Sequence, residues 1–244
     1  MKSFYEQLGD RSKKRFALLV DPDKYNDASL KVLIDHINQN PPDLLLVGGS
    51  IVFSPIDLTI IELKLKTNLP VFIFPGNVMQ LSDRADGILL LSLISGRNAE
   101  FLIGNHVLAA PHLYRSGIEV IPTGYLLIGN GQSTSVEYMS NTTPIPAKKP
   151  ELGVATAMAG EMLGLKTIYL EAGSGAANAV EQKMISAIRK KISLPLIVGG
   201  GINTVQKAEE AYKAGADMIV VSSVLEKHPE KLKEFCTLRT QLNS

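Results

Sequence analysis

Short runs of apolar residues recur along the whole chain, and eight of them have the length of a β-strand. Most of these runs are nearly continuous rather than alternating, which is typical of strands buried on both faces of a parallel sheet. Most gaps between them are long enough for a crossover helix. Eight such units predict one α/β domain over residues 1–244, a (β/α)8 barrel. The predicted strands are Phe16–Val20, Leu44–Val47, Val71–Phe74, Gly87–Leu91, Glu119–Thr123, Thr167–Leu170, Leu196–Val198 and Met218–Val221.

Helical periodicity fills several of these gaps, but the third gap differs. It is short and opens with the turn formers Pro75, Gly76 and Asn77. We therefore expect the third helix to be missing or replaced, which leaves one side of the outer ring open. In the gap before the last strand, Asn203 or Thr204 is a suitable N-cap. The predicted helices include Ala28–Asn38, Val154–Leu163, Ala179–Lys191 and Thr204–Ala214.

The longest irregular piece of the sequence spans residues 129–150 and is rich in Asn, Ser, Thr and Pro. Connections of this length within a compact domain often act as lids or partner contacts. A solvated insertion without a function explains the composition equally well, so both interpretations stay open.

Charge and composition exclude several classes of function. The chain has 25 basic and 24 acidic residues, a net charge of +1, so it has no general attraction for nucleic acid or an anionic membrane. Recognition of a phosphate group must therefore be local. The first residues lack the apolar stretch of a signal peptide, and no run reaches the ~18 apolar residues of a membrane span. We expect a soluble, cytoplasmic protein without a transmembrane segment.

Three strand ends in the second half of the chain predict a phosphate site. Each follows an apolar run and precedes a helix-like segment, so that free backbone N–H groups and serine hydroxyls converge on one anion. Two of them follow the last two strands, where (β/α)8 barrels commonly bind phosphate. The residues predicted to bind substrate here are Tyr169, Leu170, Glu171, Ala172, Gly173, Ser174, Gly175, Gly200, Gly201, Ser222 and Ser223.

Glu171 is unusual in this setting, because a carboxylate repels a bound phosphate. Its role must therefore be something other than phosphate binding. Desolvation in a closed pocket would raise its pKa and make it a suitable general base. A hydrogen-bond partner that only orients the substrate is the competing interpretation. Tyr169 is better placed to position the phosphate than to transfer a proton.

A metal site is predicted across the barrel mouth from the phosphate site. Asp21 follows the first strand and Ser50 follows the second. A carboxylate and a hydroxyl at neighbouring strand ends suit Mg²⁺, which prefers oxygen ligands and often bridges substrate phosphates. Arg97, after the fourth strand, is a candidate cation for a second phosphate group, with a plain surface arginine as the alternative.

Five segments together resemble the geranylgeranylglyceryl phosphate synthases and their bacterial PcrB-type relatives, and among these the larger subgroup. The resemblance covers nearly the whole chain, and the block at residues 169–175 is highly specific. It implies a modified (β/α)8 barrel in which the third helix is lost or replaced, in agreement with the short third gap. The five segments are Val20–Lys24, Val47–Ser50, Tyr169–Gly175, Val198–Ile202 and Ser222–Ser223.

This resemblance also implies a reaction. A Mg²⁺-dependent prenyltransferase of this family joins a long prenyl diphosphate to the C3 hydroxyl of sn-glycerol 1-phosphate, forms an ether lipid precursor and releases diphosphate. By motif, Asp21 and Ser50 match its metal positions, and the strand ends from Tyr169 onward match its glycerol phosphate site. Homo-oligomers are common in the larger subgroup, and a transient membrane contact would serve product release.

The residues leave several points open. The prenyl tail needs an apolar groove, for which the side without a third helix is our candidate. Geranylgeranyl is the first choice of donor and heptaprenyl the second. A phosphate-sugar isomerase or epimerase on the same scaffold is the leading alternative, although Glu171 lacks a clear acid-base partner. A non-catalytic barrel that binds phosphate or lipid is the third hypothesis.

Overall fold

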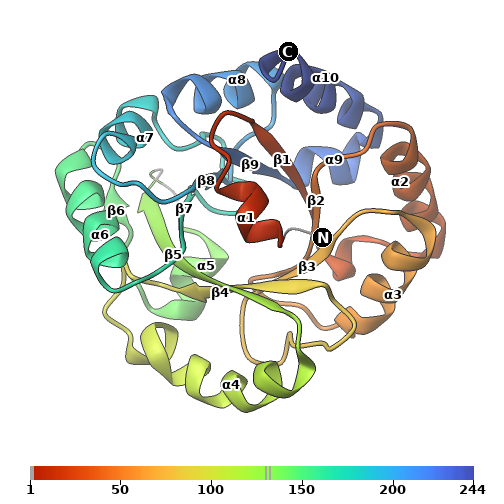
Figure 1. The fold of residues 1–244 in the computed structure, drawn as a ribbon, viewed down its shortest axis with the longest axis horizontal. Helices are drawn as coiled ribbons and strands as arrows, with labels where there is room; N and C mark the ends of the chain where they lie inside the picture. Colours follow the sequence, from red (N-terminus) through yellow and green to blue (C-terminus); the bar gives the residue numbers. More distant parts are fainter. Residues whose placement is uncertain (1–2, 130, 132) are drawn as a thin grey trace.

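The computed structural model describes residues 3–129, 131 and 133–244, and its centre is a closed barrel of eight parallel strands (Figure 1). The strand order is β4-β3-β2-β1-β9-β8-β7-β5, and the pairing of β4 with β5 closes the ring. The predicted barrel is thus confirmed, and each predicted strand is present. The strands are β1 (Arg15–Val20), β2 (Leu44–Gly49), β3 (Val71–Pro75), β4 (Gly87–Ser92), β5 (Glu119–Gly129), β7 (Thr167–Glu171), β8 (Leu196–Gly199) and β9 (Met218–Val221).

Successive residues of each strand face opposite sides of the barrel wall, and this gives the protein two apolar layers. Tyr169 belongs to a cluster that also holds Phe74, Tyr125 and Ile197 and fills the barrel interior. Leu170, the next residue, belongs to the larger cluster between the strands and the outer helices. Because both faces are buried, the strands read as continuous apolar runs.

Helices surround the barrel, and the predicted ones are confirmed with shifted ends. Thr204 caps α8 by accepting the amide N–H of Lys207, at 3.2 Å. α6 starts four residues earlier than predicted, because Pro150 suits the first turn of a helix. The long helices are α2 (Asp27–Gln39), α3 (Ile56–Lys66), α4 (Asn105–Ser116), α6 (Pro150–Met162), α7 (Gln182–Arg189), α8 (Val205–Ala214) and α10 (Leu232–Leu242). The short helical segments are α1 (Phe4–Leu8), η1 (Pro22–Lys24), the π-helical turn η2 (Glu100–Gly104), α5 (Ser135–Ser140), α9 (Ser223–Lys227) and η3 (Pro229–Lys231).

No helix joins β3 to β4, as the sequence predicts. Gln80 holds this connection in place: its side-chain Oε1 accepts the amide N–H groups of Gly49 and Gly76, both at 3.2 Å, and its Nε2 donates to the Gly49 carbonyl oxygen at 2.8 Å. Gln80 is buried, so these bonds are shielded from water. The β3–β4 loop, fixed by the hydrogen bonds of Gln80, therefore covers the side of the barrel that lacks a helix.

Two elements differ from the sequence-based expectation. β5 extends to Gly129, six residues beyond the predicted end at Thr123. A glycine such as Gly124 often marks the end of a strand. Here a Cβ would lie 2.9 Å from the side chains of Ile94, Leu165 and Ile168, so the glycine allows these side chains to pack directly against the β5 backbone. The expectation of an irregular segment over residues 129–150 was wrong in part, since it contains α5 and the two-residue strand β6 (Ile145–Pro146), which pairs with β5.

The amino-terminal end of the barrel is covered by α1, which crosses the middle of the ring in Figure 1. Phe4 and Leu8 enter the interior cluster, and the Phe4 ring lies 5.4 Å from that of Phe72. The carboxylate of Glu119 accepts the first amide N–H groups of α1, from Phe4 at 2.9 Å and Tyr5 at 2.8 Å. A negative charge at this position stabilises the positive N-terminal end of a helix. The carboxyl-terminal end of the barrel has no such cover and is open to solvent.

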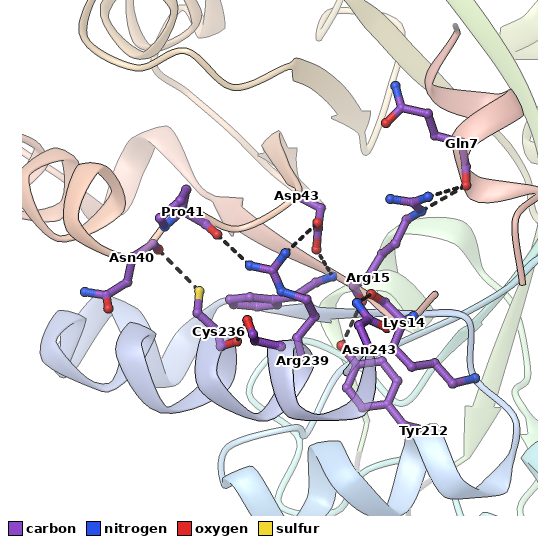
Figure 2. Close-up of polar contacts among 12 residues, drawn as sticks. Gln7, Lys14, Arg15, Asn40, Pro41, Asp43, Tyr212, Cys236, Arg239 and Asn243 are labelled. Carbon is purple, nitrogen blue, oxygen red and sulfur yellow. Dashed lines mark hydrogen bonds and ion pairs between the residues drawn. The ribbon is translucent and has the colours of Figure 1, made fainter. Parts of the chain in front are cut away.

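α10 packs on the outside of β1, between α2 and α8, and makes polar contacts with the chain around β1 (Figure 2). Arg239 Nη1 donates to Asp43 at 2.7 Å, and the other oxygen of Asp43 accepts the amide N–H of Phe16 at 2.8 Å. Burial raises the pKa of Cys236 to about 11, so its thiol stays protonated and donates to the Asn40 carbonyl oxygen at 3.3 Å. In the part of the chain that the structure describes, no helix has the length and apolar character needed to cross a bilayer.

Candidate active site at the carboxyl ends of the strands

A cavity of about 410 Å³ opens at the carboxyl ends of the strands, the end opposite α1. Residues after β1, β2, β7, β8 and β9 line it, so the topology gathers segments that are up to 200 residues apart in sequence. Most of the predicted site residues lie here. The predicted residues that line the cavity are Asp21, Ser50, Tyr169, Glu171, Ser174, Gly175, Gly200, Gly201, Ser222 and Ser223.

The alternation of β7 explains which residues of the predicted block line the cavity. Tyr169 and Glu171 face the barrel interior, whereas Leu170 packs against the outer helices. Ala172 is buried and borders a separate surface hollow beside α7 and α8. Gly173 is absent from the cavity wall, but its amide N–H donates to Glu171 Oε1 at 2.7 Å. The block therefore divides into residues that face the cavity and residues that hold them.

Glu171 is the buried carboxyl group of this site, and burial raises its pKa to about 7. Three hydrogen bonds to the carboxylate oppose this shift: one from the Gly173 amide, then one from the Tyr169 hydroxyl and one from the Tyr125 hydroxyl. A carboxyl group with this pKa is divided between its two protonation states near neutral pH. It is therefore suited to accept a proton from a bound hydroxyl group.

Tyr125 is a site residue that the sequence did not indicate. It pairs in register with Tyr169 across β5 and β7, and the two rings stack with centroids 5.2 Å apart. Burial raises the pKa of both phenols well above the usual value, with the nearby Glu171 charge adding to the effect, so both remain hydroxyl donors. The sequence does carry one signal for it: the apolar run of β5 continues after Gly124 through residues 125–128, so the strand is long enough to reach the site.

Glycine is required where β8 ends, because the backbone passes close to the side chains of Tyr169 and Glu171. A Cβ on Gly200 would lie 2.2 Å from Glu171 Oε1, and a Cβ on Gly199 would lie 1.9 Å from the Tyr169 hydroxyl oxygen. Gly200 and Gly201 also have positive φ angles of 75° and 68°. The absence of side chains leaves room for an anion to approach the backbone N–H groups.

The end of β9 carries the second half of the predicted phosphate site. Ser222 and Ser223 line the cavity and lead into the short helix α9. The hydroxyl group of Ser222 donates to Glu226 at 2.8 Å, which orients it. Loops after the last two barrel strands and a short extra helix form the usual phosphate site of this fold, and β8, β9 and α9 reproduce that arrangement.

The predicted metal ligands Asp21 and Ser50 both line the cavity. A Cβ on Gly49, the residue before Ser50, would lie 3.4 Å from Asp21 Oδ2, so the ends of β1 and β2 are close here. Burial raises the pKa of Asp21, and the charges of Asp23 and Glu226 add to this effect. A divalent cation would relieve this repulsion, so the carboxylate fits Mg²⁺ with a few protein ligands and several waters. Among the described residues, no group of three or more His, Cys, Asp or Glu side chains is arranged to hold a metal ion.

Arg97 does not reach this cavity. It is exposed and lines a different hollow with Asn141 and Thr142, and its Nη1 donates to the Gly96 carbonyl oxygen at 2.7 Å. Among the described residues that line the active-site cavity, Lys24 is the one with a cationic side chain. It follows Asp21 on η1, so a positive charge is present beside the predicted metal position.

A second, apolar cavity of about 90 Å³ adjoins the first on the side where no helix joins β3 to β4. Five residues line both cavities, so the two are neighbours that share a wall. The shared residues are Gly49, Ser50, Phe74, Tyr125 and Val136. Leucine, isoleucine and phenylalanine side chains from β4, its following loop and η2 form one part of the remaining wall, and residues of the end of β3, the β3–β4 loop, α4 and α5 form the rest. The larger, polar cavity and the smaller, apolar cavity therefore lie on either side of Ser50 and Tyr125.

Comparison with known proteins agrees with this geometry. The PcrB family matches the chain over residues 10–238. A geranylgeranylglyceryl phosphate synthase of Spirosoma linguale is 48% identical over 95% of this chain and 93% of its own length. One from Korarchaeum cryptofilum is 37% identical over 99% of this chain and 100% of its own length.

A solved structure extends the comparison to the fold. The (S)-3-O-geranylgeranylglyceryl phosphate synthase of Thermoplasma acidophilum, crystallised with its substrate sn-glycerol-1-phosphate, superposes with a TM-score of 0.92. It is 29% identical to this chain, and the match covers 99% of this chain and 100% of that one. The fold, the arrangement of the strand ends and the sequence comparisons agree, and this chain belongs to the PcrB family.

Proposed function

We propose that this protein is a prenyltransferase that joins a prenyl diphosphate, first of all geranylgeranyl diphosphate, to the C3 hydroxyl of sn-glycerol 1-phosphate. One observation carries the proposal: a cavity with phosphate-binding features and an apolar cavity share a wall that includes Ser50 and Tyr125. Two substrates of opposite polarity can therefore meet at one point. The relatives named geranylgeranylglyceryl phosphate synthase support the same activity.

The residues indicate how the reaction proceeds. Glycerol phosphate binds with its phosphate at the ends of β8 and β9, which directs the glycerol hydroxyls toward Glu171. The carboxylate accepts the proton of the C3 hydroxyl while that oxygen forms a bond to the first carbon of the prenyl chain. The bond between this carbon and the diphosphate oxygen breaks, and diphosphate leaves with the electron pair. Tyr125 and Tyr169 hold the carboxylate in place through both steps.

Magnesium is part of this proposal. Asp21 and Ser50 would hold the ion beside Lys24, where bound Mg²⁺ would stabilise the negative charge of the leaving diphosphate. The test uses thermal unfolding in the presence of diphosphate with and without Mg²⁺, because a bound ion raises the melting temperature. Asp21→Asn should abolish this increase, whereas Asp27→Asn, an exposed carboxylate on α2, should leave it intact. An unchanged increase in the Asp21 variant contradicts the assignment.

The decisive experiment for the activity is a product assay. Radiolabelled sn-glycerol 1-phosphate, or its sn-3 mirror image, is incubated with Mg²⁺ and prenyl diphosphates of several lengths, and lipid-soluble label is extracted. We expect label in the lipid phase with the sn-1 isomer alone, and the best donor length identifies geranylgeranyl or heptaprenyl. No transfer with any donor would favour a phosphate-sugar isomerase or a non-catalytic barrel, although such an isomerase has no use for the apolar cavity.

We also propose that the protein forms a homo-oligomer. Ile103 on η2 and Val107 and Leu108 on α4 are exposed apolar side chains on neighbouring turns. A single-copy protein seldom exposes such a cluster without a function. Light scattering of the purified protein should give a mass above 26.4 kDa, and Val107→Glu should lower it. A mass of one chain for the unmodified protein contradicts the proposal.

A further inference from the structure

The loops after β7 and β8, which carry most of the proposed phosphate site, lie in direct contact with each other. The loop after β7 covers residues 172–181, and the loop after β8 covers residues 200–204. A Cβ on Gly200 would lie 2.8 Å from the carbonyl oxygen of Gly173, and a Cβ on Gly201 would lie 2.3 Å from that of Asn178. The backbones of the two loops therefore pack against each other with no side chain between them.

The loop after β8 presents backbone donors that the protein itself does not use. The N–H groups of Gly200, Gly201 and Ile202 have no acceptor among the described residues, and all three residues line the active-site cavity. Successive N–H groups of this kind suit the oxygen atoms of a phosphate. No backbone hydrogen bond joins residues 173–181 to residues 200–204, all of which the structure describes. The spacing of the two loops must therefore be held by other contacts.

Lys207, in the first turn of α8, connects the two loops through its side chain. Its Nζ donates to the carbonyl oxygen of Ala177 at 2.7 Å, to Oδ1 of Asn203 at 3.0 Å and to the carbonyl oxygen of Gly201 at 3.4 Å. Ala177 belongs to the loop after β7, and the other two residues belong to the loop after β8. An ammonium group has three N–H donors, so each donor of Lys207 has a partner.

Lys207 makes these contacts from outside the active site. It borders the surface hollow beside α7 and α8 and is absent from the wall of the active-site cavity. The carbonyl group of Gly201 points toward Lys207, so the N–H group of Ile202 in the same trans peptide unit points the opposite way. A positive charge in the first turn is unfavourable for a helix. The contacts with the two loops, and not the stability of α8, therefore explain a lysine at this position.

We propose that Lys207 is a positioning residue for glycerol phosphate. Its ammonium group holds the loops after β7 and β8 at the spacing at which their N–H groups bind one phosphate. This inference rests on the proposed function for the identity of the ligand. Without Lys207 the phosphate itself must order the loops, and this entropic cost weakens binding. Once the phosphate is bound the loops are in place, so Lys207 acts on affinity and not on the reaction step.

The chain supplies a matched control on the same helix. Lys207→Met removes the ammonium group and keeps a long, unbranched side chain. Lys213→Met is the control, because the Lys213 side chain is 65% exposed and its Nζ pairs with Glu209 at 2.6 Å. Lys207→Arg keeps the charge and the N–H donors and should recover most of the affinity. Asn203→Ala removes one acceptor of the same ammonium group and should weaken binding by a smaller factor.

The first experiment is calorimetric titration with sn-glycerol 1-phosphate, without Mg²⁺ or a prenyl donor. We expect an affinity about tenfold lower for Lys207→Met, in low and in high salt, and an unchanged affinity for Lys213→Met. An unchanged affinity in Lys207→Met or an equal loss in both variants would overturn the proposal. A loss that disappears in high salt would also overturn it, because it would assign Lys207 a long-range electrostatic effect.

Amide hydrogen exchange tests the loops directly. Without ligand, exchange within residues 173–181 and 200–204 should be faster in Lys207→Met than in the unmodified protein. Saturation with glycerol phosphate should remove the difference, because the ligand then orders the loops. Equal exchange rates without ligand would contradict a role of Lys207 in holding them.

Steady-state kinetics separate positioning from a general structural role. We expect the KM for glycerol phosphate to rise about tenfold in Lys207→Met, while kcat, the KM for the prenyl diphosphate and the melting temperature stay unchanged. A lower melting temperature with equal losses for both substrates would mean that Lys207 only supports the fold. Absence of transfer in the unmodified protein contradicts the proposed function alone if the titrations differ as expected. An unmodified protein that binds no glycerol phosphate contradicts both proposals.

Discussion

Tyr125 and Tyr169 lie opposite each other on β5 and β7, with ring centroids 5.2 Å apart, and both hydroxyls donate to the same carboxylate, Glu171. A buried carboxylate is costly unless its oxygens are hydrogen-bonded. The two phenols and the Gly173 amide meet this requirement. They leave Glu171 with a pKa of about 7, within the working range of a general base.

Replacing Glu171 with Gln should separate activity from stability. The amide keeps the shape of the side chain but cannot accept a proton, so we expect prenyl transfer to fall by about 100-fold or more. The melting temperature near pH 8 should be unchanged or higher, because a buried charge is removed. Initial rates and thermal unfolding measure the two quantities, and full activity in this variant would restrict Glu171 to orienting the glycerol.

The pH dependence of stability gives an independent check on the same group. The pKa of Glu171 is about 7 in the folded protein, above its ordinary value of 4.5. The folded state therefore binds more protons between these values, and its free energy of unfolding falls as the pH rises from about 4.5 through 7. Glu171→Gln should remove this part of the decline. Chemical unfolding at several pH values compares the two proteins, and parallel curves would contradict the raised pKa.

Tyr125→Phe should shift the activity profile toward alkaline pH. The lost hydroxyl donates to the charged form of Glu171 and lowers its pKa, so its removal raises the pKa and moves the rising limb of the rate profile upward. Initial rates over a pH series locate the midpoint. Tyr114→Phe, an exposed position on α4, is the control. An unshifted midpoint would mean that Tyr125 only fills space.

Gln80→Ala should loosen the loop that replaces the third helix. The substitution leaves the half-buried amide N–H groups of Gly49 and Gly76 without their acceptor, and we expect a loss of about 1 kcal/mol or more in the free energy of unfolding. Gly49 lines both cavities, so the KM values for both substrates should rise. Gln241→Ala, an exposed position on α10, should change neither stability nor kinetics. Unaltered KM values would show that the β3–β4 loop does not contribute to substrate binding.

Asp217→Ala should destabilise the protein without changing the residues that line the active-site cavity. Asp217 is buried between the starts of β8 and β9, where it accepts Arg189 Nη1 at 2.9 Å and the Leu196 amide at 2.8 Å. Loss of one partner leaves a buried guanidinium unpaired, at a cost of ~3–5 kcal/mol. Glu209→Ala breaks the exposed pair with Lys213 and should cost less than about 1 kcal/mol. Denaturant unfolding compares them, and equal losses would contradict the burial argument.

The sequence by itself determined the barrel and most of its mouth. Strands buried on both faces must read as continuous apolar runs, and the positions after those runs carry Asp21, Ser50, Gly200 and Ser222 because the fold exposes strand ends at one edge. The short third gap also predicted the missing helix correctly, since residues 75–86 begin with turn formers and leave little room for helical turns.

The tertiary structure alone decided which of these residues meet. Residues 169–175 appear as one motif, but the alternation of a strand sends Tyr169 and Glu171 inward and Leu170 outward. The same alternation and the pairing of β5 with β7 bring Tyr125 to Glu171. Arg97 follows a strand end as the other site residues do, yet its loop turns away and Lys24 lines the cavity instead. Direction and register depend on contacts between distant segments, and a local pattern of residues carries no information about them.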